Sequence, residues 1–230
     1  MSGPRILLIV AGLAALLGYL ALFGDEGADV ARGVEETDIA FAAIQVELTA
    51  MQPAYEFLTS QGGQLRFGVK EQRDRVQRDL ARLQGDRVGI LTDDTLHPRE
   101  RLPRLRSLVT GSDQLLAYAR TIRRQMEART RFMQDASAVL AEIADLDGRL
   151  AARLARADAG EPGMEVGEAD RARHATLATT LAETTQLLQK ADQLIGQNLD
   201  QGTRMADQTL RTLQELRDGL RNIADDLDLD

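Results

Sequence analysis

The residues best suited to metal chemistry are His97 and the two aspartates that precede it, Asp93 and Asp94. An imidazole and two carboxylates are acceptable zinc ligands, but a zinc site needs a defined ligand spacing that this segment lacks. We therefore expect a surface turn in which the aspartates cap helix ends. The other histidine, His174, falls on a polar helical face beside arginines, and we expect it to face solvent.

The remaining catalytic patterns are incomplete in this sequence. The serines lack a Gly-x-Ser-x-Gly context, and neither lysine follows a glycine-rich phosphate loop. Residues 145–149 do not complete the ligand spacing of a calcium loop. The chain has no cysteine, which excludes disulfides and thiolate metal sites. The sequence thus predicts a protein that is not an enzyme, with no catalytic residues, no cofactor and no metal.

The most informative feature is an uncharged apolar run at residues 6–23, followed by a chain that is mostly polar. As a helix this run would span roughly 27 Å, close to the bilayer hydrocarbon core of about 30 Å. It is longer than the apolar core of about 7–15 residues in a signal peptide, which is the alternative interpretation. We expect a single-pass anchor in the lipid bilayer, and assign to it Ile6, Leu13, Leu17 and Phe23.

The charges around this run favour one membrane orientation. Arg5 precedes the run and mostly acidic residues follow it, so the positive-inside rule places the bulk of the chain in the periplasm, anchored in the inner membrane. Small residues pair at four-residue spacing within the run, as Ala11/Ala15 and Ala14/Gly18. Such pairs let two membrane helices approach closely, so the sequence is also compatible with a homo-oligomer.

The composition beyond the run is typical of long helices. The chain is 43% hydrophobic but only 3% aromatic, with no tryptophan, which disfavours a sheet protein. Arginines are concentrated between residues 66 and 131, a pattern that also occurs in nucleic-acid-binding proteins. Acidic residues at helical spacing interrupt this stretch and aromatic residues do not interleave with it. We therefore expect salt-bridged helix faces and no nucleic-acid partner.

Apolar and small residues recur at alternating spacings of three and four, which indicates coiled-coil packing. Pro53 lies inside the first such segment and should kink the helix near residues 49–53. Asn198 falls on the seam of the fourth expected helix, where a buried asparagine would fix the register. The main seam residues are Phe41, Ile44, Leu48, Leu115, Ile122, Leu140, Leu181, Leu188 and Ile195.

The expected fold is all-α, with a single transmembrane helix followed by an elongated antiparallel helical bundle or coiled-coil hairpin. A short N-terminus and the anchor should occupy residues 1–24, and a membrane-proximal helical hairpin residues 25–83. An irregular connection should follow at 84–103. A long antiparallel hairpin should cover 104–224, with its turn near 159–167, and an acidic tail 225–230.

This organisation favours a structural or adaptor subunit of a bacterial envelope complex, which binds other envelope proteins. One alternative is a sensory or signalling module that acts through a membrane partner, because no second apolar stretch after Phe23 is long enough to cross the bilayer. Another is a cytoplasm-facing scaffold of a motor or division assembly.

Overall fold

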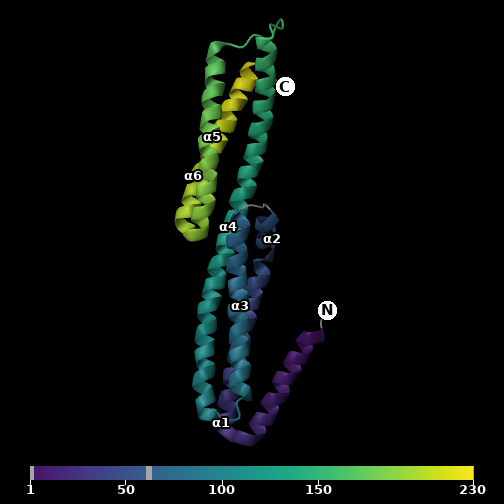
Figure 1. The fold of residues 1–230 in the computed structure, drawn as a ribbon, viewed down its shortest axis with the longest axis vertical. Coiled ribbons are helices and arrows are strands. Elements are labelled where there is room, and N and C mark those ends of the chain that lie inside the picture. Colours follow the sequence, from purple (N-terminus) through teal and green to yellow (C-terminus); the bar gives the residue numbers. More distant parts are fainter. Residues whose placement is uncertain (1–2, 61–63, 230) are drawn as a thin grey trace. The chain divides into compact units, whose positions relative to one another are not determined.

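The protein is all-α in the computed structural model, as the sequence predicts (Figure 1). The structure describes the backbone of residues 3–60 and 64–229, and the side chains of residues 27–60 and 68–229. The described helices are α1 (Gly3–Ala50), α2 (Gln52–Ser60), α3 (Gln64–Thr92), α4 (Pro98–Asp158), α5 (Glu168–Gln197) and α6 (Leu199–Asp226). They form two compact units, residues 1–123 and residues 124–230, so α4 contributes to both.

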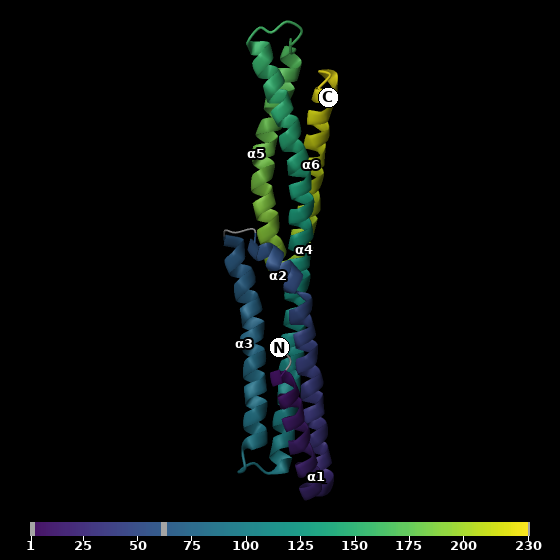
Figure 2. The same ribbon diagram turned by 90° about the vertical axis from the view of Figure 1, so that its right-hand side faces the viewer.

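In the first unit, the later part of α1, continued by α2, packs beside α3 and the beginning of α4 (Figures 1 and 2). Helix α3 runs antiparallel to α1 and α2, because Arg87 near its end pairs with Asp38, while Arg73 near its start donates to Gln52 Oε1 at 2.8 Å. Helix α4 returns alongside α1, where Arg120 pairs with Glu47 at 3.2 Å. The first unit is therefore a three-helix bundle.

The kink expected at Pro53 is confirmed. Helices α1 and α2 are separated by the single turn residue Met51. Proline has no N–H group, and its ring clashes with the carbonyl four residues earlier. Backbone hydrogen bonds continue on both sides, from Met51 N to Glu47 O at 3.0 Å and from Tyr55 N to Met51 O at 2.9 Å. The helix consequently bends at this point and does not end.

The expected irregular connection over residues 84–103 is wrong, since α3 continues to Thr92 and only residues 93–97 separate it from α4. Gly85 and Gly89 each cost a helix about 1 kcal/mol relative to alanine. Tertiary contacts offset this cost, because Arg87 between the glycines pairs with Asp38 and lies 5.3 Å from the centre of the Phe41 ring.

The second unit consists of the rest of α4 with α5 and α6 (Figures 1 and 2). The turn expected near residues 159–167 lies between α4 and α5. Helix α5 runs antiparallel to α4, because Arg171 near its start pairs with Asp158 at 2.8 Å, and Asp192 near its end pairs with Arg129 at 2.7 Å.

The sequence also predicts one continuous fourth helix from about residues 166–170 to 224, and this prediction is wrong. Asn198 has an extended backbone conformation and joins α5 to α6, which folds back on α5. Asn198 is exposed and not buried at a seam, and its side chain accepts a hydrogen bond from Gln201 N at 3.1 Å, as a helix N-cap does. Gly202 then meets Ile195 so closely that a Cβ atom would lie 2.2 Å from Ile195 N. The expected two-helix hairpin over 104–224 is thus replaced by a three-helix unit that begins within α4.

The hydrophobic core of the second unit explains why α6 folds back. Its main cluster combines one face of α4 with one face of α6, and α5 covers it with half-buried leucines. The buried members are Ala136, Val139, Ile143, Leu146, Leu150, Leu213, Leu216, Leu220, Ile223 and Ala224. A second cluster near the α5–α6 turn contains Phe132, Ala191, Ile195 and Ala206.

The expected acidic tail at 225–230 is structured up to residue 229. Asp226 is the last residue of α6. Leu227 and Leu229 pack against the main core cluster, and Arg149 Nη1 donates to Leu229 O at 3.3 Å. The leucines that alternate with the aspartates explain the difference, because they complete the apolar face of α6.

Candidate functional site

The seam residues assigned from the sequence lie at core positions of the two units. The fully buried ones are Phe41, Ile44, Leu48, Leu115, Ile122 and Ile195. The half-buried ones are Leu140, Leu181 and Leu188, which pack against the cores of the second unit. All nine serve packing in three-helix arrangements.

The four anchor residues, Ile6, Leu13, Leu17 and Phe23, lie outside the part of the chain whose side chains are described. The backbone there belongs to α1. Within the described residues, no helix has a stretch long and apolar enough to span a membrane.

The turn before His97 is organised by hydrogen bonds. Asp93 Oδ1 accepts from the hydroxyl of Thr95 at 2.5 Å and from its backbone N–H at 3.0 Å. The N–H of His97 lies 3.4 Å from Glu100 Oε2, and Pro98 occupies the first helical position of α4, where it needs no partner for an N–H. Among the described residues, no three His, Cys, Asp or Glu side chains group together as metal ligands would. These side chains therefore terminate α3 and start α4.

The pKa of Asp93 is lowered from its ordinary value of 3.8, first by the Thr95 hydroxyl, then by the Thr95 N–H, with help from the charges of Arg104 and Arg101. A lowered folded-state pKa stabilises the protein above the unfolded pKa, and this contribution disappears as the pH falls through the folded value. Replacing Thr95 with valine should raise the pKa of Asp93, as measured by NMR titration of its carboxyl carbon. A Thr92→Val control, on the last turn of α3, should leave that titration unchanged, and an unchanged titration in Thr95→Val would contradict the assignment.

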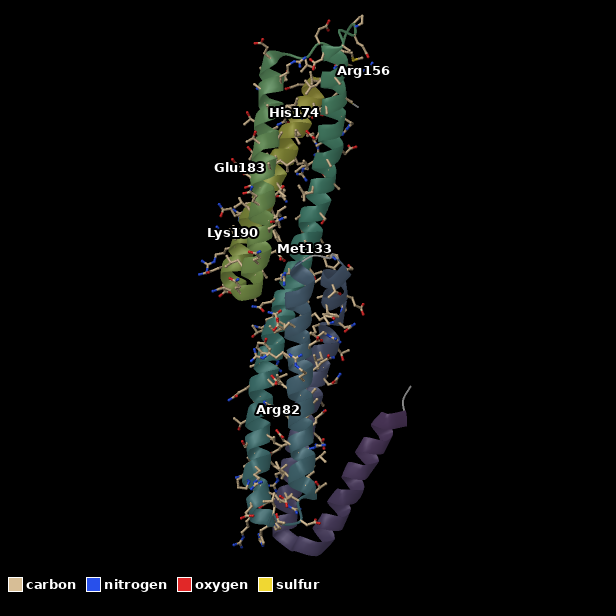
Figure 3. The ribbon with its side chains drawn as sticks, in the orientation of Figure 1. Arg82, Met133, Arg156, His174, Glu183 and Lys190 are labelled. Atoms are coloured by element: carbon tan, nitrogen blue, oxygen red, sulfur yellow. The ribbon has the colours of Figure 1, made fainter. Side chains whose placement is uncertain are left out.

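His174 is half-buried rather than fully exposed as the sequence suggested. Its Nε2 lies 2.7 Å from Asp147 Oδ1, which links α5 to α4. Glu183 and Lys190, on the outer side of α5, are exposed (Figure 3). His174 therefore belongs to the interface between helices.

A buried ion pair is the main polar feature that sequence reasoning missed. Arg129 Nε and Nη2 donate to the two carboxylate oxygens of Asp192 at 2.8 and 2.7 Å. Their side chains are only 9% and 7% exposed. The available signal was the spacing of Arg129, which continues the seam between Met126 and Met133, where a charged residue requires a buried partner. The pair fixes α5 on α4.

Two open grooves remain as candidate binding surfaces. The first follows the outer face of α1 and is lined by Ala42, Gln45, Val46, Thr49 and Ala50. The second lies where α3 meets α4, and is lined by Gly85, Asp86, Gly89, Ile90, Asp93, Leu96, Arg104, Ser107 and Leu108. The first is mainly apolar and the second is mixed in polarity.

No family model, curated protein or solved structure matches this chain.

Proposed function

We propose that this chain is a single-pass membrane protein that presents helical bundles in the bacterial periplasm and acts as a structural or adaptor subunit of an envelope complex. The observation that carries the proposal is the uncharged apolar run at residues 6–23, which lies on the same helix, α1, as the start of the first bundle. Because no flexible linker interrupts this helix, it would hold the bundle at a fixed distance from the anchor.

The character of the surfaces supports an adaptor. The described grooves are open and lie on helix faces, and the turn at His97 is occupied by capping hydrogen bonds. Buried and half-buried polar contacts in the second unit join helices to one another. Open grooves on helix faces are the kind of surface through which helical proteins bind other proteins.

The anchor is tested by placing charge within the apolar run. Leu13→Arg with Leu17→Arg should release the protein from membranes washed with alkaline carbonate, because each arginine near the centre of a membrane helix costs about 2.5–3.5 kcal/mol. Leu13→Phe with Leu17→Phe is the matched control and should stay in the membrane pellet. Extraction of the wild-type protein by carbonate would contradict the anchor.

The orientation and the adaptor role need separate measurements. An alkaline phosphatase fused after Asp230 should be active, because the enzyme works only outside the cytoplasm. Affinity purification of the tagged full-length protein from cross-linked membranes should recover a stoichiometric set of envelope proteins. An inactive fusion would reverse the orientation, and recovery of the bait alone would contradict the adaptor role.

A further inference from the structure

The outer face of α1 exposes large apolar side chains on an otherwise well-packed bundle. Ile39 is 63% exposed and Val46 is 65% exposed. Val46 lines the first groove, and Ile39 lies one heptad before it on the same helix, so we define the α1 outer face as Ile39, Ala42, Gln45, Val46, Thr49 and Ala50. Exposed apolar positions that line up in this way mark interaction sites more often than isolated ones do.

The spacing on this face identifies the shape of an occupant. Ile39 and Val46 are one heptad apart, with the small Ala42 between them. The opposite face of α1 is already buried in the bundle through Phe41 and Ile44. Helix α1 therefore carries two seams, and a seam with heptad spacing packs against another helix through knobs in holes.

The charges on α1 identify the chemistry of an occupant. Asp38 and Glu47 already pair with arginines of α3 and α4, and Asp29 pairs with Arg32. Glu35 and Glu36, one turn before Ile39, are exposed and form no ion pair among the side chains that the structure describes. One end of the α1 outer face is thus acidic and has no ion-pair partner among the described side chains.

We propose that the α1 outer face binds an amphipathic helix of a partner protein, with apolar residues at heptad spacing flanked by lysine or arginine. A second copy fits less well. Parallel pairing of two such faces would bring the Glu35 and Glu36 carboxylates together, and antiparallel pairing would set them opposite Thr49 and Ala50, which carry no charge. This inference deepens the proposed adaptor role by naming the surface and its partner class, but it does not depend on the membrane anchor.

Two synthetic peptides of about four heptads, long enough to be helical, test the surface directly. Both carry the same leucine and alanine seam, flanked by lysine and arginine in one and by glutamate in the other. Binding to the full-length protein in detergent micelles is measured by fluorescence anisotropy. The basic peptide should bind, and Val46→Glu should weaken it by at least about tenfold, or 1.4 kcal/mol. Val88→Glu on α3, an exposed valine elsewhere in the same unit, is the matched control and should leave binding unchanged.

Charge reversal and cross-linking complete the test. Glu35→Lys with Glu36→Lys should transfer the preference to the acidic peptide, with circular dichroism showing that each variant keeps its helices. Absence of binding, equal binding of both peptides, or equal effects of Val46→Glu and Val88→Glu would overturn the proposal.

Because the chain has no cysteine, Val46→Cys supplies a single thiol. Rapid formation of a disulfide-linked dimer in that variant would identify a second copy as the occupant and would also overturn it. If the wild-type protein were soluble without detergent and still bound the basic peptide, the proposed membrane anchor would be wrong but this inference would hold.

Discussion

Asp192→Ala should lower the free energy of unfolding by about 3–5 kcal/mol, because it leaves the guanidinium of Arg129 buried without its carboxylate. The Arg129 side chain is only 9% exposed, so water cannot replace the lost partner. Urea unfolding of the full-length protein, followed by circular dichroism, measures the loss. Hydrogen exchange should locate it in the second unit, at α4 and α5.

Two companion variants make this result specific. Glu142→Ala removes a carboxylate that pairs with Arg221 at 3.4 Å on the surface, and should cost less than about 1 kcal/mol. Arg129→Leu with Asp192→Leu removes both buried charges, and should recover most of the stability. Equal losses for Asp192→Ala and Glu142→Ala would show that the buried pair has no special energetic role.

Gly202→Ala should destabilise the second unit by about 1–3 kcal/mol or more, as overpacking does. The added Cβ would lie 2.2 Å from Ile195 N, 2.3 Å from Ile195 Cα and 2.7 Å from Leu194 C. These are backbone atoms, which cannot move aside as a flexible side chain can. Helices α5 and α6 would have to separate at their turn, which thermal unfolding would report as a lower Tm.

Gly148→Ala on α4 is the matched control, since its added Cβ would meet no atom within 4 Å apart from the adjacent backbone of its own helix. That variant should stabilise its helix by up to about 1 kcal/mol, because alanine has the higher helix propensity. The sign of the stability change in Gly202→Ala also tests whether α6 folds back on α5. If α5 and α6 were one continuous helix, Gly202→Ala would stabilise the protein just as Gly148→Ala does.

The helical class, the core positions and the bend at Pro53 follow from local rules of spacing and proline chemistry, and these could be predicted. The α5–α6 turn could not, because the alternating spacing of three and four continues through it, from Ile195 through Asn198 and Gly202 to Met205. Asn198 carries no glycine or proline beside it, and the same residue type serves both as a buried seam residue and as an N-cap. The choice between them depends on Gly202, whose close approach exists only once the helix has folded back.

The α1 outer face could not be predicted from the sequence either. Helix α1 has two apolar seams, and spacing alone does not decide which one packs within the bundle. Phe41, Ile44 and Leu48 are larger than Ile39, Ala42 and Val46 as a set, so burying them removes more apolar surface from water. The exposed seam becomes visible only after the first has been assigned. In the same way, Asp192 could not be identified from the sequence as the partner of Arg129, because the pairing depends on how α5 aligns with α4.

The core shared by α4 and α6 has a consequence for protein synthesis. On α4, Val139, Ile143 and Leu150 are covered largely by residues of α6, which leave the ribosome after all of α5. Until then, the nascent chain displays an apolar face that only α5 can shield in part, and such faces promote aggregation. The second unit therefore depends on a holding chaperone until α6 has emerged.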